Sequence, residues 1–384
     1  MSDNESRECR VSGSDGRLIA RRQLELRRIL YYVTHKPALL ARILNATAIS
    51  AFTKRIPHWQ TSISLTEACN MNCEHCFSKL FTKKAKQNQQ KELTTDEIIG
   101  FIKETLELGV FAFDLQGGEV FLHPDLEDII LACEPSRSHI GIITNGTLFN
   151  ESWALKLKRL GVDKICVSID SGIEKEHDDF RRSPGTWKQA TNAVDLALKF
   201  KFRVYVLTTV THENLHSEGV TKIREYCIKK KVRNWLFIAI PVGNWRGKQE
   251  FLIDEKDHEF IADLNRRSRG LIARDISPHM FGFLKGCPAV TEAIHMTSYG
   301  DVMPCPFTHI SLGNIRDHRL KDIIDRALTI EEFRTNKPVC LIGEDREFIR
   351  KYGHKTFESD EGPLDGEEVL GFESKLSRRN DSGT

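Results

Sequence analysis

The sequence predicts an α/β protein with a parallel sheet, open or curled into a partial barrel, and two observations support this fold class. Short apolar segments of strand character alternate with amphipathic segments of helical length between residues 61 and 240. Glycine-rich or polar motifs follow the strand segments, where parallel α/β sheets carry their sites. The strands are expected at 61–66, 110–115, 139–143, 163–169, 202–209 and 234–240, and the helices at 94–108, 124–133, 150–160, 186–200 and 217–230.

Composition sets the broad class of the protein. The 384 residues are 40% apolar and 29% charged, enough for two globular domains or one large α/β domain with extensions. A net charge of +2 gives no general argument for a nucleic-acid partner. The polar first residues do not lead into a signal peptide, and no stretch is long enough to span a bilayer, so we expect a cytoplasmic protein. Ten cysteines in that compartment indicate metal or redox chemistry more than disulfides.

The segment before the first strand differs from the rest. Residues 1–16 are polar and predicted to be disordered. Residues 17–58 form a basic helical segment with nine Lys/Arg and one acid, Glu25; Pro37 divides it, and the second helix is expected from Ala38 to Phe52. The favoured interpretation is a helical layer on the main domain with a solvated basic side. The alternative is a basic helix that touches a membrane surface or an acidic partner.

The barrel is expected over residues 59–268. Its first helix has a capping-box start, formed by Thr94 and Glu97. A small C-terminal extension follows over 269–356. The last part, 357–384, is rich in Glu, Ser, Asp and Gly and is predicted to be a disordered tail.

Three cysteines follow the first strand: Cys69, Cys73 and Cys76, with the spacing C-x3-C-x2-C. Three thiolates on one loop can hold three corners of an iron–sulfur cube and leave one iron open to a ligand that is not protein. A zinc site is the alternative, with His75 as the only nearby fourth ligand, although zinc more often uses two separated pairs. A chance cluster of buried cysteines is a further alternative.

The next three strands also end in motifs. Gly117-Gly118-Glu119 follows the second strand and offers close backbone approach and a carboxylate for an ammonium group. Thr144-Asn145-Gly146 ends the third, and Ser168 and Asp170, on one face, end the fourth. Ordinary turn and cap chemistry is the alternative explanation for each.

Together these motifs resemble the radical S-adenosylmethionine (SAM) enzymes, in order, over residues 61–240. The resemblance implies a partial (β/α)6 TIM-like barrel in which Cys69, Cys73 and Cys76 hold a [4Fe-4S] cluster with an open iron. It implies that Gly117, Gly118 and Glu119 bind the amino group of SAM. It also implies SAM contacts from Thr144, Asn145, Ser168, Asp170 and Arg181, with Arg182 an equal candidate.

The C-terminal extension resembles the SPASM/Twitch region that follows many radical SAM barrels. The resemblance rests on Cys287-Pro, on Tyr299-Gly300-Asp301 before Cys305, and on Cys340. It implies one auxiliary [4Fe-4S] cluster, held by these three cysteines. A fourth thiolate is missing, so His309, Glu344, Asp345 or His354 completes the site or an iron stays open.

The implied activity is that of a radical SAM oxidoreductase or maturase. An electron from a flavodoxin- or ferredoxin-like donor cleaves SAM to a 5′-deoxyadenosyl radical, which abstracts hydrogen from a peptide or small-molecule substrate. One alternative is a lipid or cofactor precursor as substrate, with peripheral membrane contact. An alternative of another class is a non-catalytic zinc or iron–sulfur binding protein.

Overall fold

The computed structural model describes residues 32–53, 58–274, 286–334, 337–372 and 375–379. The predicted disordered segment 1–16 lies outside these ranges, as does the first part of the basic segment. Within the ranges, no helix is long and apolar enough to cross a membrane.

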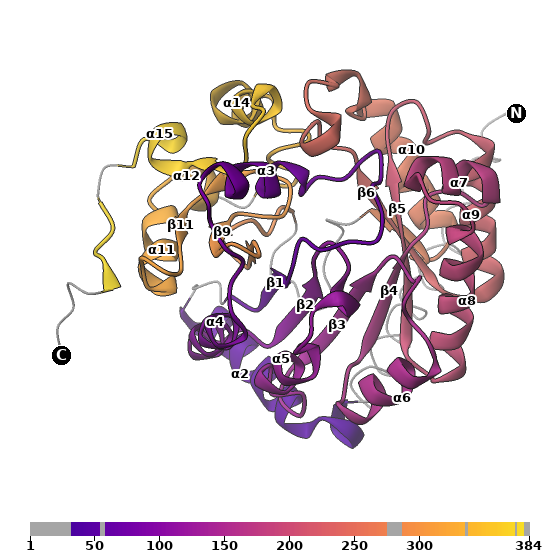
Figure 1. Ribbon diagram of the computed structural model, residues 1–384, viewed down its shortest axis with the longest axis horizontal. Coiled ribbons are helices and arrows are strands. Elements are labelled where there is room, and N and C mark those ends of the chain that lie inside the picture. Colours follow the sequence, from indigo (N-terminus) through magenta and orange to yellow (C-terminus); the bar gives the residue numbers. More distant parts are fainter. Residues whose placement is uncertain (1–31, 54–57, 275–285, 335–336, 373–374, 380–384) are drawn as a thin grey trace, which may run out of the picture.

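A ten-stranded sheet forms the centre of the molecule, in the order β11-β9-β8-β1-β2-β3-β4-β5-β6-β7. From β1 to β7 every strand pairs in parallel with its successor, and helices cover the outer side (Figure 1). The sheet curls without closing, as a partial barrel, so the predicted fold class is confirmed. The strands are β1 Gln60–Ser64, β2 Ala112–Gln116, β3 His139–Thr144, β4 Lys164–Ser168, β5 Arg203–Val210, β6 Arg233–Ile238 and β7 Ile272–Arg274.

The helices predicted within the barrel are all present. Thr94 and Glu97 form the predicted capping box of α4, whose Phe101 and Ile102 are buried against the sheet side. Three helices of the barrel were not predicted, α3, α7 and α10, because their basic or acidic sequences hide the apolar period. The helices of the barrel are α3 Lys79–Gln87, α4 Thr95–Glu107, α5 Leu126–Ala132, α6 Glu151–Arg159, α7 Glu174–Arg181, α8 Thr186–Lys199, α9 Glu218–Lys230 and α10 Glu255–Arg267.

The boundary predicted between barrel and extension, at residue 268, is wrong. β7 lies beyond it and pairs with β6, which makes it a strand of the barrel. β8 pairs in parallel with β1, so the extension continues the same sheet rather than forming a separate unit. Its elements are β8 Ala293–Met296, β9 Asp301–Met303, β10 Ile310–Ser311, β11 Gly313–Asn314, α11 Leu320–Ala327, α12 Glu331–Arg334, α13 Arg346–Phe348 and α14 His354–Glu358.

The prediction of a disordered tail from residue 357 is also wrong for most of its length. β12 (Leu364–Asp365) pairs with β10, and α15 (Gly366–Leu370) buries Val369 and Leu370. Further along, the Nε of Arg379 donates to the carbonyl of Ile315 at 2.7 Å. A few apolar anchors in a polar sequence are enough to hold this segment on the extension, and composition alone does not show them.

The N-terminal helix α2 (Pro37–Thr53) covers the end of the barrel where the strands begin. The ammonium of Lys36 donates at 2.6 Å to the carboxylate of Asp163, the residue directly before β4. Leu39 packs in one cluster with Trp59 and Phe111, which precede β1 and β2. The expected helical layer is therefore present in α2, whereas seven of the nine Lys/Arg of the segment lie outside the described residues, so its basic side stays a prediction. In Figure 1 α2 lies at the opposite margin of the barrel from α3.

Candidate functional site

The three cysteines lie on the loop that leaves the carboxyl end of β1 and enters α3. Cys73 is buried, and Cys69 and Cys76 are half-buried. The loop is fixed on one side by the end of β2, where the Gly118 amide donates to the carbonyl of Thr66 at 2.6 Å and the Glu119 amide to that of Ala68 at 2.8 Å. The first two cysteines therefore follow a stretch that is held to a neighbouring strand.

The two glycines after β2 make this contact possible. A Cβ atom at position 117 would lie 2.5 Å from the Thr66 oxygen, and one at position 118 would lie 2.4 Å from the Ala68 oxygen. No side chain fits at these distances, so the close backbone approach expected of Gly117 and Gly118 is made by the cysteine loop itself.

The loop is fixed on its other side by residues that the sequence reasoning did not identify. Asn244 donates from its side chain to the Cys73 carbonyl at 2.9 Å and from its amide to the Cys76 carbonyl at 3.0 Å. Gly243, at φ +64°, approaches Cys76 where a Cβ would lie 2.3 Å from its oxygen. The signal was present, because Gly243 and Asn244 follow the sixth strand at the same edge of the sheet.

The chemistry of the three thiols fits a cationic cluster. Burial raises the pKa of Cys69 to about 11 and also raises the pKa of Cys73, so without a cation both stay protonated. Iron deprotonates its thiol ligands and supplies the missing positive charge. His75, the one nearby candidate for a fourth ligand, stacks on Phe180 with ring centroids 4.6 Å apart. The loop thus offers three sulfur donors from eight residues, as an iron–sulfur cluster with an open corner requires.

Glu119 joins two of the predicted motifs. Its buried carboxylate accepts from the Thr144 hydroxyl at 2.7 Å and from the Asn145 amide at 2.9 Å. Burial raises the pKa of Glu119 to about 7, although these hydrogen bonds act in the opposite direction. The Asn145 side chain donates to Asn70, inside the cysteine motif, at 2.9 Å. The ends of β2 and β3 and the cysteine loop therefore meet at one carboxylate that lacks a cationic partner of its own in the described hydrogen bonds and ion pairs.

A second buried network lies beyond the end of β4. The Arg181 guanidinium pairs with the Asp170 carboxylate through Nε and Nη2, both at 2.7 Å. Its Nη1 donates to the Cys73 sulfur at 3.8 Å. Asp170 also accepts from the Thr209 amide at 3.0 Å, which fixes the carboxylate on β5. Ser168 is half-buried at the end of β4.

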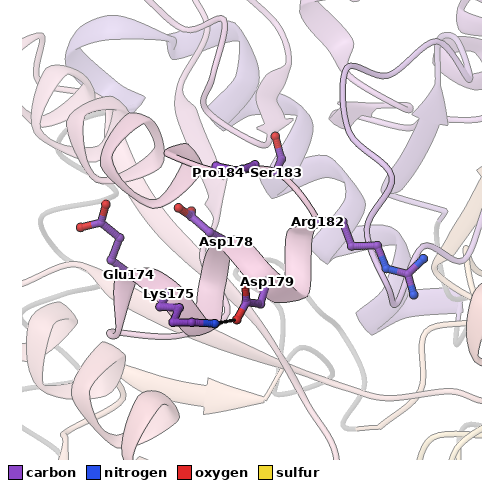
Figure 2. Close-up of a pocket in the computed structure, with 7 residues that line it drawn as sticks. All are labelled: Glu174, Lys175, Asp178, Asp179, Arg182, Ser183 and Pro184. Atoms are coloured by element: carbon purple, nitrogen blue, oxygen red, sulfur yellow. Dashed lines mark hydrogen bonds and ion pairs between the residues drawn. The ribbon is translucent and has the colours of Figure 1, made fainter.

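The structure distinguishes Arg181 from Arg182, which the sequence offered as equal candidates for a SAM contact. Arg181 is buried beside Cys73, whereas Arg182 is exposed and ends α7 in the left-handed region. Arg182 lines an open depression on α7, and Figure 2 shows its side chain pointing away from Asp178 and Asp179. Asp178 accepts from the amides of residues 185 and 187, so it caps the start of α8. This depression lies at a helix junction, and none of its lining residues belongs to the cysteine loop.

The extension brings two of its three cysteines close in the fold. The Cys287 amide donates to the carbonyl of Lys337, three residues before Cys340, at 2.9 Å. Cys305 contacts Thr308, with Sγ and Oγ1 2.9 Å apart, and starts the loop in which Phe307 packs on Phe77, next to Cys76. A common site for all three sulfur atoms stays a prediction.

The four candidates for a fourth ligand differ clearly in whether their side chains already have hydrogen-bond or ion-pair partners. Glu344 accepts two hydrogen bonds from Arg274, at 2.8 and 2.6 Å, and Asp345 pairs with Lys337 at 2.5 Å. Burial acts to raise the pKa of Glu344, but hydrogen bonds from His258 and Arg274 lower this pKa to about 2. His309 is only 1% exposed, and neither of its ring nitrogens has a hydrogen-bond partner among the described residues. The Nδ1 atom of the half-buried His354 is also without one.

Comparison with known proteins agrees with this geometry. The family model of the radical SAM superfamily matches residues 63–222, and that of an iron–sulfur cluster-binding domain, SPASM, matches residues 287–342. The AdoMet-dependent heme synthase of Methanosarcina barkeri is 28% identical over 297 residues, 70% of this chain and 83% of that protein. The subtilosin biosynthesis protein AlbA of Bacillus subtilis is 26% identical over 292 residues, 72% and 62% of the two chains.

Solved structures show the same fold. Native anSMEcpe with bound AdoMet superposes with a TM-score of 0.54 at 20% identity, over 70% of this chain and 80% of that chain. Streptococcus suis SuiB, bound to its precursor peptide SuiA, superposes with a TM-score of 0.52 at 16% identity, over 68% and 62%.

Residues 63–222 therefore form a radical SAM domain, and a SPASM domain follows it at residues 287–342. It is accordingly an enzyme, and its cofactors are SAM and a [4Fe-4S] cluster, with auxiliary iron–sulfur binding in the SPASM domain. The predicted family, fold class and cofactors are confirmed, and the non-catalytic alternative is not favoured.

The first prediction compares the two arginines. Arg181→Met leaves the Asp170 carboxylate buried without its cation, which is expected to lower the free energy of unfolding by about 3–5 kcal/mol. The matched change Arg182→Met removes an exposed charge and is expected to alter stability by no more than about 0.5 kcal/mol. Urea unfolding followed by circular dichroism measures both, and equal effects would contradict the assignment of Arg181 to the buried network.

The second prediction concerns the protonation of Glu119. Since its pKa is about 7, the neutral acid predominates below that pH and must lose its proton before it can accept an ammonium group. SAM binding is therefore expected to weaken on acidification, approaching about tenfold per pH unit below pH 7. Glu119→Gln should lose about 1.5–3 kcal/mol of binding energy and the pH dependence with it. Calorimetric titration from pH 6 to pH 8 tests this; a wild-type affinity that does not vary with pH removes Glu119 from the SAM site.

Proposed function

We propose that this enzyme cleaves SAM reductively and uses the resulting radical to abstract hydrogen from a small molecule. The observation that supports it is the meeting of the cysteine loop with the Glu119 carboxylate and the Arg181–Asp170 pair. Cys69, Cys73 and Cys76 would hold the cluster, and the bound cluster would supply the electron for reductive cleavage of SAM. A flavodoxin- or ferredoxin-like protein is the proposed donor of that electron.

The chain's own residues bind and orient SAM. Glu119, held by Thr144 and Asn145, accepts the ammonium group of the methionine moiety as a charge-assisted hydrogen bond. Arg181 places a positive charge beside Cys73, and Asp170 holds its guanidinium so that one nitrogen remains directed at the loop. Ser168, at the end of β4, contacts the polar part of SAM. Gly117 and Gly118 act indirectly, because they let the loop lie on the end of β2.

Two observations favour a small molecule over a peptide as substrate. Three heme synthases align over 70–71% of this chain and 75–83% of their own length, whereas AlbA aligns over 62% of its length. The helix α2, before the barrel, packs at the amino ends of the strands, the end opposite the cysteine loop, and so offers no peptide-binding surface beside that loop. The two classes are separated by titrating a tetrapyrrole precursor of heme and a cysteine-rich peptide. A Soret shift on binding, with faster 5′-deoxyadenosine release, supports the first; a response to the peptide alone supports the second.

The third prediction tests the chemistry itself. The anaerobically reconstituted and reduced enzyme should release 5′-deoxyadenosine from SAM, measured by chromatography. Replacing Cys69, Cys73 and Cys76 together with Ala should abolish release, because no cluster with an open iron then assembles. Cys227→Ala is the matched control, since that buried cysteine lies in the core on α9. Continued SAM cleavage by the triple variant would contradict the assignment of these three cysteines as the cluster ligands.

His309 is the proposed fourth ligand of one auxiliary cluster with Cys287, Cys305 and Cys340. It lies four residues after Cys305, and its buried ring nitrogens are without partners in the described part of the chain. Burial lowers the pKa of His309 to about 3, so the ring is neutral, which is the form that binds metal. An unpaired buried polar group costs about 1–3 kcal/mol, which a metal bond would offset.

The fourth prediction follows from this ligand set. The Cys69/Cys73/Cys76 triple-alanine variant should retain about four irons per chain, and adding Cys287→Ala and Cys305→Ala should remove them. In the triple variant, His309→Ala should change the electron paramagnetic resonance spectrum and reduction potential of the remaining cluster, and His309→Cys should restore a stable cluster. His354→Ala is the control that should change neither. An iron-free triple variant would reduce the SPASM region to a structural hairpin.

A further inference from the structure

The outer face of α2 is apolar in a way that its packing does not explain. Its inner face is buried through Leu39 and Ala46, in the cluster at the base of the barrel. On the other side Leu44 is 60% exposed and Phe52 is 88% exposed. These two positions are eight residues apart, with Ala48 between them, so they share one face of the helix.

Isolated exposed apolar side chains are normal, but here they are concentrated. Eight large apolar residues are exposed in the described ranges, and four belong to α2 or the turn before it: Val33, Leu44, Ile49 and Phe52. The helix sequence itself contains no Asp or Glu. These apolar side chains, beside the exposed Asn45 and Thr47, favour a second apolar environment besides the barrel.

The charge around the helix indicates which environment this is. Besides Lys36, which is paired with Asp163, the sequence of residues 17–58 contains eight Lys/Arg and one acid, and Lys54 and Arg55 directly follow the helix. An apolar face with basic flanks matches an anionic bilayer, where the apolar groups enter the headgroup region and the cations meet the phosphates. A second copy of the chain is a poor match, because the basic flanks of two copies would repel each other.

We propose that α2 docks the enzyme peripherally on an anionic phospholipid surface, with Leu44 and Phe52 inserted. The docked orientation follows from the fold. Lys36, at the start of the helix, is paired with Asp163 where β4 begins, whereas the cysteine loop leaves β1 at its carboxyl end. The reaction site thus lies at least one strand length, about 17 Å, from the docking face and opens away from the bilayer. Docking locates the enzyme at the membrane and leaves its substrate to arrive from the aqueous side.

Flotation of the full-length protein with vesicles tests this proposal. The protein is expected to float with vesicles of phosphatidylcholine and phosphatidylglycerol, to stay behind with phosphatidylcholine alone, and to be released by high salt. Leu44→Glu/Phe52→Glu should weaken binding at least about tenfold, because two apolar side chains no longer insert. Ile228→Glu, a matched change of a 48% exposed residue on α9, should bind as the wild type does.

Three outcomes overturn the proposal. Failure to float with anionic vesicles, or equal binding by the double variant, rules out the membrane as the docking partner of α2. A wild-type dimer in light scattering that Phe52→Glu converts to a monomer makes the face a contact between copies. A lower melting temperature for Phe52→Glu shows that the chain itself covers this side chain. SAM cleavage by the double variant should be unchanged, so a failure of docking is distinguishable from a failure of the proposed function.

Discussion

The close backbone contact between the cysteine loop and the end of β2 is the constraint on which the rest of the site depends. At 2.4–2.5 Å from a carbonyl oxygen there is no space for a Cβ atom at position 117 or 118. The loop can therefore lie flat across the strand end only because glycine stands at both positions. The same contact carries Glu119 into the buried position where Thr144 and Asn145 meet it, so one steric condition places both the sulfur donors and the carboxylate.

The electrostatics of the site follow from burial of this arrangement. Thiols and a carboxylate that are withdrawn from water resist ionisation. Burial accordingly raises the pKa values of Cys69, Cys73 and Glu119. The buried Arg181 is held by Asp170 and meets the sulfur of Cys73. The protein thus presents donors whose charges are compensated fully only when cationic groups arrive, an arrangement that favours a cluster and an ammonium-bearing ligand over water.

Much of this was predictable from the sequence, and the exceptions have physical causes. The six strands and their terminal motifs were predicted because apolar period and strand-end placement are local properties. Helix α7 was missed because seven of its eight residues, EKEHDDFR, are charged or polar. The position of Asn244 after the sixth strand was visible in the sequence. Its role was not, because it donates to two carbonyls of a loop 168 or more positions away, which no local pattern records. The ordered tail was missed because Val369 and Leu370 find their apolar partners only in three dimensions.

The pairing of β8 with β1 has a consequence for biosynthesis. Gln60 is aligned with Ala293, so the edge of the strand that carries the metal-binding loop is completed by a segment that leaves the ribosome much later. Until then that edge exposes unpaired amide and carbonyl groups, which favours association with other nascent chains. Contacts of such long sequence separation also slow folding. Assembly of the barrel and of the SPASM domain is thereby coupled. A ribosome-bound fragment that stops short of residue 293 is expected to depend on chaperones to keep its first strand protected.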